Sequence, residues 1–318
     1  MERTFRHVYG PVPSRRLGRS LGVDLVPFKV CTYDCIYCQL GQTTNKTIER
    51  KQYVPTGEVM DELERKLAAG DLPDYISLAG SGEPTLHSGI GEIVRGIKGM
   101  TEIPVAVITN GSLLWMDEVQ DALMAADLVI PSLDAGDEKL FRHVNRPHPG
   151  IEFDRMVEGI ASFTRRFSGE VWLEVFLLGG VTGISSEVAK IAALVERIAP
   201  ARVQLNTVAR PTTEDFAMAV SRGRLKLLAK AIPGRVEIIA GSPDIDAAAS
   251  ADAGSAESDV LSLLERRPCT VEGIASGLKL KPAEVVKVLG RLSSGGEVVS
   301  ERFGSRVFYS IALRRGES

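Results

Sequence analysis

The sequence predicts an α/β fold, in which a parallel sheet is covered by helices, followed by a smaller C-terminal domain. Apolar, β-rich runs alternate with helical patterns at about thirty residues per unit, the order expected of parallel strands joined by outer helices. The chain has 318 residues, more than the roughly 100–200 of one typical domain. From Gly241 the composition becomes small and acidic, which predicts a linker over residues 241–257. We therefore expect domains at residues 1–240 and 258–318.

The elements of the first domain follow from local patterns. Gly10–Gly18 is too rich in Gly and Pro for a helix, so we expect a loop that leads into the first strand, Leu21–Phe28. Later strands are predicted from runs of Val, Ile and Leu, and helices from longer stretches with helical periodicity. The expected strands are 21–28, 74–79, 105–109, 128–133, 171–178, 202–208 and 236–240, and the expected helices are 56–69, 90–97, 114–125, 153–167, 186–198 and 214–232.

The residues after the linker look like a winged helix, with three short helices over 259–266, from 271 and over 281–292, and a hairpin over 297–310. Ten Lys and Arg against seven Asp and Glu give residues 258–318 a charge of +3. Basic residues on the third helix and near the hairpin tip would suit a nucleic acid, but winged helices also dock peptides and proteins, so both partners stay open. These basic residues are Lys281, Lys287, Arg291, Arg302 and Arg306.

Composition sets limits on the whole chain. Hydrophobic residues make up 44% and charged residues 25%, as in globular proteins. The net charge of −3 argues against a nucleic-acid-binding surface over the entire chain. No apolar run reaches the roughly 20 residues that span a bilayer, so no membrane partner is expected. The N-terminal residues lack the apolar core of a secretion signal, which predicts a reducing, cytoplasmic location.

Three of the four cysteines lie within eight residues, in Cys31-Thr-Tyr-Asp-Cys35-Ile-Tyr37-Cys38. Three thiolates at this spacing suit a 4Fe-4S cluster and leave its fourth iron without a protein ligand. Zinc is the rival, but a structural zinc site needs four ligands, and the sequence has no second Cys-x-x-Cys or His-x-x-x-His. Cys269 is distant in sequence and is expected to be a buried, small apolar residue.

The pattern Cys-x-x-x-Cys-x-aromatic-Cys, with Tyr37 as the aromatic residue, resembles the cluster loop of radical S-adenosylmethionine (radical SAM) enzymes. The resemblance covers roughly residues 5–240 and implies a partial (β/α)6 TIM-like barrel. It also implies that SAM chelates the free iron and that an electron from the cluster splits SAM to a 5′-deoxyadenosyl radical. The opening Gly-Pro-Val-Pro-Ser-Arg-Arg-Leu-Gly is similar to that of the subgroup containing the tRNA wyosine synthases.

Further candidates lie at the carboxyl ends of the expected strands, where parallel barrels keep their chemistry. Ser81-Gly82-Glu83 resembles the Gly-Gly-Glu segment that holds the SAM amino group in this family, with Ser81 at the first Gly. The resemblance also assigns SAM contacts to polar residues after the third and fourth strands, although turn formation explains the same residues. These are Thr109, Asn110, Ser132 and Asp134.

Charged and amide groups inside two later strands are additional candidates. Glu174 lies between Trp172 and Phe176 on one strand face, where a carboxylate needs a partner. It could accept bonds from the SAM ribose or form a structural ion pair. We expect Asn206 to contact adenosine and Arg210 to contact substrate. The bland interpretation of Arg15, Arg16 and Arg19 is solvated surface charge, and the alternative is that one of them reaches the cluster mouth to bind a carboxylate or phosphate.

These features favour a radical SAM enzyme that abstracts hydrogen from an unidentified substrate, with RNA or a nucleotide suggested by the wyosine synthase resemblance. A reducing partner such as flavodoxin or ferredoxin would supply the electron. Two alternatives remain. One is a maturase that modifies a peptide or protein docked on the winged helix, and the other is a SAM- or redox-sensing iron–sulfur regulator that binds DNA.

Overall fold

The computed structural model describes residues 5–70, 72–239 and 256–312, so the expected linker lies largely outside the described residues. Eight strands form one sheet in the order β1-β2-β5-β6-β7-β8-β9-β10. All neighbours in this sheet pair in parallel except β1 and β2. The strands are β1 (Val8–Ser14), β2 (Gly18–Val23), β5 (Tyr75–Leu78), β6 (Val105–Thr109), β7 (Leu128–Pro131), β8 (Glu170–Leu177), β9 (Arg202–Thr207) and β10 (Val236–Ile238).

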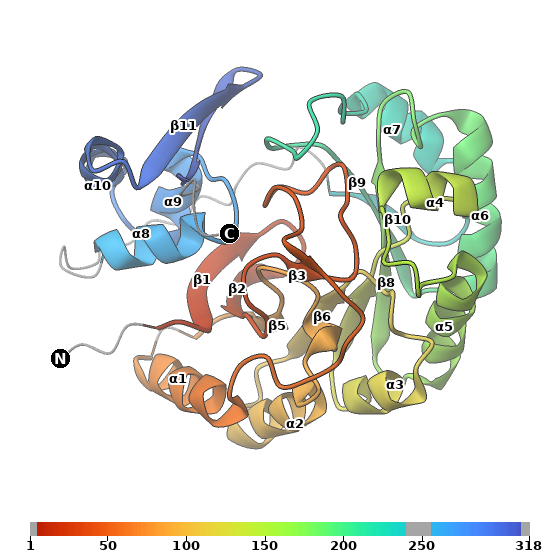
Figure 1. The fold of residues 1–318 in the computed structure, drawn as a ribbon, viewed down its shortest axis with the longest axis horizontal. Coiled ribbons are helices and arrows are strands. Elements are labelled where there is room, and N and C mark those ends of the chain that lie inside the picture. The colour runs from red at the N-terminus through yellow and green to blue at the C-terminus, as the bar shows by residue number, and fades with distance from the viewer. Residues whose placement is uncertain (1–4, 71, 240–255, 313–318) are drawn as a thin grey trace.

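Helices α1, α2, α3, α5 and α6 follow one another along the outer side of the sheet (Figure 1). Each turns an apolar stripe toward the strands; in α2, Ile90, Ile93, Val94 and Ile97 are buried at helical spacing. α4 and α7 also bury residues in the core that these helices share: Phe141 in α4, and Leu225 and Leu228 in α7. The bounds are α1 (Thr56–Ala68), the 3-10 helix η1 (Pro84–Leu86), α2 (Ile90–Met100), α3 (Asp117–Leu123), α4 (Glu138–Val144), α5 (Phe153–Arg166), α6 (Ser185–Ile198) and α7 (Arg222–Ala229).

The two faces of the sheet have different partners. On β8, Val171, Leu173, Val175 and Leu177 belong to the large core shared with the outer helices. The alternate residues of β8 face the other side, called here the inner face, because side chains of a strand point to opposite faces in turn. The inner face is therefore free to carry the polar groups of a site. The α/β class and the mostly parallel sheet agree with the prediction.

The N-terminal segment differs from the prediction, because residues 8–14 form the edge strand β1 instead of a loop. Prolines are tolerated there since an edge strand needs only half of its backbone donors. The register shifts between Tyr9 and Val12, which places Gly10 and Pro11 in an irregular stretch with Gly10 at a φ of 95°. The following strand ends at Val23, earlier than expected, and residues 24–29 lead into the cysteines.

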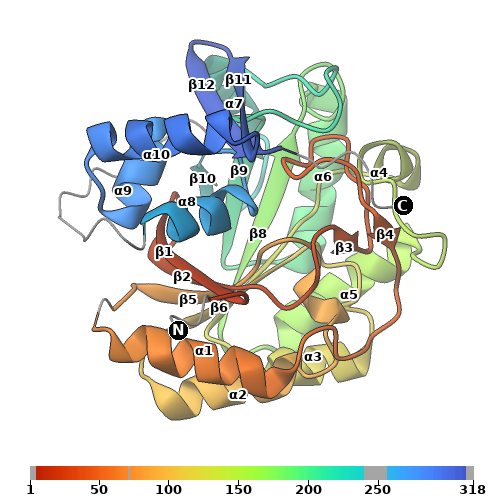
Figure 2. The same ribbon diagram turned by 60° about the vertical axis from the view of Figure 1, so that its left-hand side comes forward.

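Residues 256–312, called here the C-terminal unit, contain three helices and a hairpin and lie beside β1 (Figure 2). Their core includes Val260, Ile274, Val285 and Leu289, and Val12 of β1 joins it. Cys269 is buried in this core, as predicted. No helix in the described ranges is long and apolar enough to cross a membrane. The elements are α8 (Ala256–Leu264), α9 (Val271–Leu278), α10 (Pro282–Ser294), β11 (Val298–Phe303) and β12 (Arg306–Ile311).

Candidate cofactor site

The cysteine loop, residues 31–38, starts at the short strand β3 (Val30–Cys31), which pairs with β4 (Asn45–Lys46). Its backbone is held by residues from distant elements. The amides of Asp34 and Ile36 donate to carbonyls at the end of α4, 3.0 Å away in both cases, and the amide of Thr213 donates to the Cys38 carbonyl at 2.9 Å. The loop conformation is therefore fixed from both sides by the folded chain.

Each of the three thiols in this loop receives a hydrogen bond. Lys29 Nζ donates to Cys38 Sγ at 3.0 Å. Asn145 Nδ2 lies 3.5 Å from Cys35 Sγ, and Asn110 Nδ2 lies 3.6 Å from Cys31 Sγ. These donors come from the loop after β2, from the end of α4 and from the end of β6, so only the folded chain brings them together.

Sequence reasoning missed Lys29 and Asn145. The available signal for Lys29 was a lone lysine inside the apolar stretch before the cysteines, and the structure buries its side chain almost completely. Asn145 follows the last residue of α4, a helix that was not predicted, so the sequence could not show where the Asn145 side chain points. The first residue of that helix follows Asp137, whose carboxylate accepts from the Leu140 amide as an N-cap.

The thiols themselves lie close to one another. Burial raises the pKa of Cys31 to about 12, and the neighbouring charges of Glu83 and Cys38 add to this effect. Burial also raises the pKa of Cys35 well above its usual value, with further contributions from Asp134, Cys31 and Cys38. Cys31 and Cys35 are therefore expected to be neutral thiols at pH 7 before metal binds, and iron would displace their protons.

The donor set fits an iron–sulfur cluster. Three sulfurs lie on one loop, and hydrogen bonds to cluster sulfurs are a common feature of such sites. Among the described residues, no three His, Cys, Asp or Glu side chains are arranged to bind one metal ion. A cuboidal cluster makes a different demand, because each cysteine binds a different iron.

Ser81-Gly82-Glu83, called here the SGE segment, follows β5 and packs against the start of the cysteine loop. The Glu83 amide donates to the Val30 carbonyl at 3.1 Å, and the Lys29 amide donates to the Ser81 carbonyl at 2.8 Å. A Cβ atom on Gly82 would lie 1.9 Å from the Val30 carbonyl oxygen. Only glycine allows this approach, which explains the residue without reference to a ligand.

Thr109 and Asn110 meet Glu83, as expected for the ends of neighbouring parallel strands. The buried Glu83 carboxylate accepts from Thr109 Oγ1 at 2.6 Å and from the Asn110 amide at 2.7 Å. Thr85 donates to it through both its amide, at 3.0 Å, and its hydroxyl, at 2.6 Å. Burial raises the pKa of Glu83, while these bonds oppose the rise. Glu83 thus ties the ends of β5 and β6 together.

Tyr37 and Asp134 form a second polar cluster beside the cysteines. The Tyr37 ring stacks on Phe176 with centroids 4.1 Å apart, and its hydroxyl donates to the Asp134 carboxylate. Asn145 Nδ2 donates to the same carboxylate at 2.7 Å. Burial raises the pKa of Asp134 to about 6, although the bonds from Tyr37 and Asn145 lower it. Asp134 therefore links the cysteine loop to the inner face.

Glu174 forms the ion pair that the sequence left as one of two interpretations. Arg16 Nη1 and Nη2 donate to its two oxygens at 2.8 and 2.9 Å, and Asn206 Nδ2 donates at 2.8 Å. Burial alone would raise the pKa of Glu174, but the Arg16 guanidinium outweighs it and holds the pKa below its usual value. Ser132 lies next to this pair, since it bridges to Glu174 in the parallel register. Contacts of Glu174, Asn206 and Ser132 with SAM stay predictions.

Arg15, Arg16 and Arg19 lie at or next to the turn between β1 and β2, and contact of any of them with a ligand stays a prediction. β1 folds back antiparallel on β2, so the turn between them lies at the amino end of β2, whereas the cysteines follow its carboxyl end. Arg15 donates to the Ile239 carbonyl at 3.4 Å, and Arg16 bonds to Glu174 on the inner face. The Arg19 amide donates to the Asp74 carboxylate, before β5. Leu17 packs in the same turn against Ala106, Leu128, Ile130 and Trp172.

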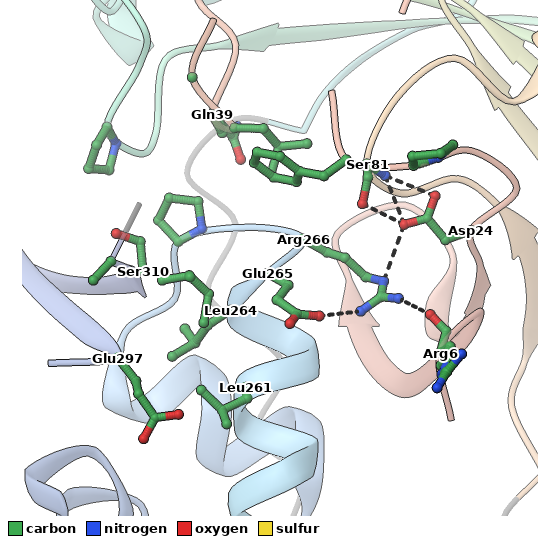
Figure 3. A pocket seen from close by; sticks show the side chains of 18 of the residues that line it. Arg6, Asp24, Gln39, Ser81, Leu261, Leu264, Glu265, Arg266, Glu297 and Ser310 are labelled. Atoms are coloured by element: carbon green, nitrogen blue, oxygen red, sulfur yellow. Dashed lines mark hydrogen bonds and ion pairs between the residues drawn. The ribbon is translucent and has the colours of Figure 1, made fainter. Parts of the chain in front are cut away.

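Arg210 lies beside the cysteine loop, where its Nη1 donates to Gln39 Oε1 at 3.2 Å. A cavity of about 980 Å³ adjoins this region and separates the loops around the cysteines from the C-terminal unit. Its lining includes Gln39, Ser81 and Asp24 from one side and Arg266 from the other (Figure 3). Arg266 and Asp24 were not among the residues that the sequence singled out.

Comparison with known proteins agrees with these features. Residues 25–195 match the model of the radical SAM superfamily. A UPF0026 protein of Methanocaldococcus jannaschii is 31% identical over 95% of this chain and 94% of its own length. The GTPase Obg of Brachyspira hyodysenteriae is 39% identical over 97% of this chain, which spans only 45% of that protein. A probable GTP 3′,8-cyclase of Saccharolobus islandicus is 31% identical over 46% of this chain and 45% of its own length.

Solved structures share the fold at low sequence identity. A radical SAM methyltransferase from Sphaerobacter thermophilus has a TM-score of 0.51 and 17% identity, covering 69% of this chain and 66% of that one. SuiB of Streptococcus suis bound to S-adenosylmethionine has a TM-score of 0.51 and 13% identity, covering 71% and 53%. The matched family model, the cysteine loop and the mostly parallel sheet lead to one conclusion: the chain belongs to the radical SAM superfamily.

Proposed function

We propose that the chain is a radical SAM enzyme that uses a 4Fe-4S cluster on Cys31, Cys35 and Cys38. When bound, the cluster and SAM supply a 5′-deoxyadenosyl radical that removes a hydrogen atom from the substrate. The three cysteines would hold three irons, and the SGE segment would receive the SAM amino group. The remaining chemistry is binding and positioning by the protein.

One observation carries the proposal. Three thiols of a single loop each face a hydrogen-bond donor, and the SGE segment is bonded directly to the backbone at the start of that loop. The loop would therefore hold three irons through thiols whose backbone is fixed by the fold, next to a segment bonded to the same loop. Tyr37, the aromatic residue of the cysteine pattern, is held beside the loop by stacking on Phe176 and by its bond to Asp134.

The first test is cluster assembly. The chain is reconstituted with iron and sulfide under anaerobic conditions, and iron and labile sulfide are counted per chain. We expect about four of each in the unmodified chain and in Cys269→Ala, whose thiol is buried in the core of the C-terminal unit. Cys35→Ala should lose most of its iron. Full iron content in Cys35→Ala would refute the cluster assignment.

The second test is cleavage of SAM. Reduced, cluster-loaded protein is incubated with SAM, and 5′-deoxyadenosine is measured by mass spectrometry. Its formation supports an enzyme, with a flavodoxin or ferredoxin proposed as the natural electron donor. A fully loaded, reducible cluster that binds SAM but yields no 5′-deoxyadenosine with any candidate substrate would contradict the proposal and favour a sensor.

We propose a nucleotide or RNA as the substrate class. The support is the partial relative named as a probable GTP 3′,8-cyclase and the positive charge of residues 258–318, for which a winged helix is proposed. The test compares 5′-deoxyadenosine formation with nucleoside triphosphates, transfer RNA and basic peptides. Stimulation by a nucleotide or RNA supports the assignment. Stimulation by peptide alone contradicts it and favours a peptide maturase.

A further inference from the structure

Arg266 lies in the turn after α8, and its side chain contacts Asp24, the residue after β2, outside the C-terminal unit (Figure 3). Its side chain is only 7% exposed. Its Nε lies 3.4 Å from Asp24 Oδ2, and its Nη2 donates to the Arg6 carbonyl at 2.7 Å. Glu265, an exposed neighbour, lies 3.5 Å from Nη1. Asp24 is thus the buried counter-charge of Arg266.

Asp24 also holds the SGE segment. The Ser81 amide donates to both oxygens of Asp24 at 3.1 Å, and the Ser81 hydroxyl donates to Oδ2 at 2.6 Å. Gly80 lies directly against this carboxylate, since a Cβ atom there would be 2.3 Å from Asp24 Cγ. Arg266 and Ser81 therefore share one buried carboxylate, and the serine at the first position of the segment has a structural role.

Tyr9 provides a second connection between Arg266 and the same segment. The Arg266 guanidinium lies over the Tyr9 ring, 4.5 Å from its centroid. The Tyr9 hydroxyl donates to the Ala79 carbonyl at 3.1 Å. Arg266 consequently contacts both side chains that hold residues 79–81, although it belongs to a different part of the chain.

Burial raises the pKa of Asp24, whereas Arg266 and the Ser81 bonds lower it. Without Arg266 the carboxylate would be buried with no opposite charge, which is unfavourable unless it takes up a proton or water. A protonated carboxyl group accepts hydrogen bonds more weakly than a carboxylate, so the Ser81 bonds would weaken. Residues 79–83 would then be less ordered, and binding a ligand there would cost more conformational entropy.

We infer that Arg266 is a positioning residue for SAM, through which the C-terminal unit fixes the SGE segment by way of Asp24. This inference rests on the proposed function, in which that segment binds SAM. The C-terminal unit is then part of the cofactor site as well as a candidate partner-binding domain. SAM affinity depends on its docking against β1, whereas iron binding does not, because the cysteine donors all come from residues 29–145.

The test uses the full, cluster-loaded chain and compares Arg266→Met with Arg267→Met. Arg267 is the matched control, because it donates to the Pro13 carbonyl at 3.5 Å and, within the described residues, no hydrogen bond or ion pair joins it to Asp24. Equilibrium binding of SAM should weaken about tenfold in Arg266→Met, within the usual range of coupling between sites. It should change less than twofold in Arg267→Met, and iron content should be unchanged in both.

A second variant and a second readout separate positioning from unfolding. Asp24→Asn leaves the C-terminal unit intact and should weaken SAM binding to a similar extent. In the protein without SAM, hydrogen exchange of the amides over 79–83 should be faster in Arg266→Met and Asp24→Asn, while exchange in α9 stays as in the unmodified chain.

Three results would overturn the inference. They are equal SAM affinity of Arg266→Met and the unmodified chain, unchanged exchange over 79–83, or faster exchange throughout α8–α10, which would mean that the arginine only stabilises its own unit. If the unmodified chain itself fails to bind SAM, the proposed function falls, and the exchange measurement still decides whether Arg266 orders the segment.

Discussion

The buried pair of Arg16 and Glu174 is the clearest place to test the structure. The two side chains are 13% and 12% exposed and are joined by two bonds of 2.8 and 2.9 Å. Arg16→Met keeps most of the volume but leaves the carboxylate buried without its counter-charge. Removing one partner of a buried pair costs about 3–5 kcal/mol of unfolding free energy. We expect a loss of that size.

The assay is urea unfolding followed by tryptophan fluorescence. Trp172 is one of two tryptophans and lies two residues from Glu174 on the same strand face, so it reports on this region. The double variant Arg16→Met/Glu174→Gln should recover most of the loss, because no charge is left buried. Arg165→Met, which breaks an exposed pair on α5, is the control and should have little measurable effect.

The pH dependence of stability independently checks the sign of the contribution that the Arg16–Glu174 pair makes to the free energy of unfolding. Arg16 holds the pKa of Glu174 below its usual value of 4.5, so the unmodified chain has this stabilisation above pH 4.5 and loses it as the pH falls further. In Arg16→Met the burial effect is opposed only by the Asn206 hydrogen bond and the Arg15 charge, so the pKa of Glu174 should rise and acid should then stabilise the chain relative to neutral pH. A loss below about 1 kcal/mol at pH 7, or a double variant less stable than Arg16→Met, would refute the geometry.

Three further predictions follow from the site. Gly82→Ala should lower the free energy of unfolding in urea by about 1–3 kcal/mol or more, because its Cβ would lie 1.9 Å from the Val30 carbonyl oxygen. Gly290→Ala, with open space around it on α10, is the control and should raise that free energy by about 0.5–1 kcal/mol. Equal effects of the two substitutions would contradict the packing at Gly82. Lys29→Met should lower the midpoint potential of the reconstituted cluster by about 60 mV in an EPR-monitored titration. The reason is that Lys29 Nζ lies 3.0 Å from Cys38 Sγ, where its positive charge favours the reduced state of the cluster. An unchanged potential would exclude this role of Lys29. Burial raises the pKa of Asp134 from 3.8 to about 6. The free energy of unfolding of the unmodified chain should therefore fall by on the order of 3 kcal/mol as the pH rises from 4 to 6. Asp134→Asn should remove this pH dependence in urea unfolding.

Local patterns were enough to predict the cysteine loop and most strands. A thiol trio within eight residues is a property of sequence spacing, and alternation of β-rich runs with helical patterns follows from side-chain direction in each element. Thr109 and Asn110 were predicted as SAM contacts at a strand end, and in the structure they donate hydrogen bonds to Glu83 in the segment after the neighbouring parallel strand. A feature can be predicted from sequence where one short segment, or one rule of strand pairing, is enough to specify it.

The surroundings of the residues near the N-terminus depended on strand direction. The sequence of Gly10–Gly18 contains turn residues that suit either a loop or an irregular edge strand, and only pairing with β2 decides between them. That pairing is antiparallel, so it reverses the turn and sends Arg16 to Glu174 from the end opposite the cysteines. The sequence left open whether this guanidinium is solvated or binds a ligand, and in the structure it pairs with a carboxylate of the chain itself.

The sequence by itself determined which groups are chemically available: three thiols in one loop, a Ser-Gly-Glu turn after a strand, and polar residues at strand ends. Tertiary structure decided which groups face each other, and therefore placed Lys29, Asn110 and Asn145 on the three sulfurs and Arg266 against Asp24. The physical reason is that hydrogen bonds and ion pairs act over about 3 Å, while these partners are separated in the chain by as many as 242 residues (266 − 24).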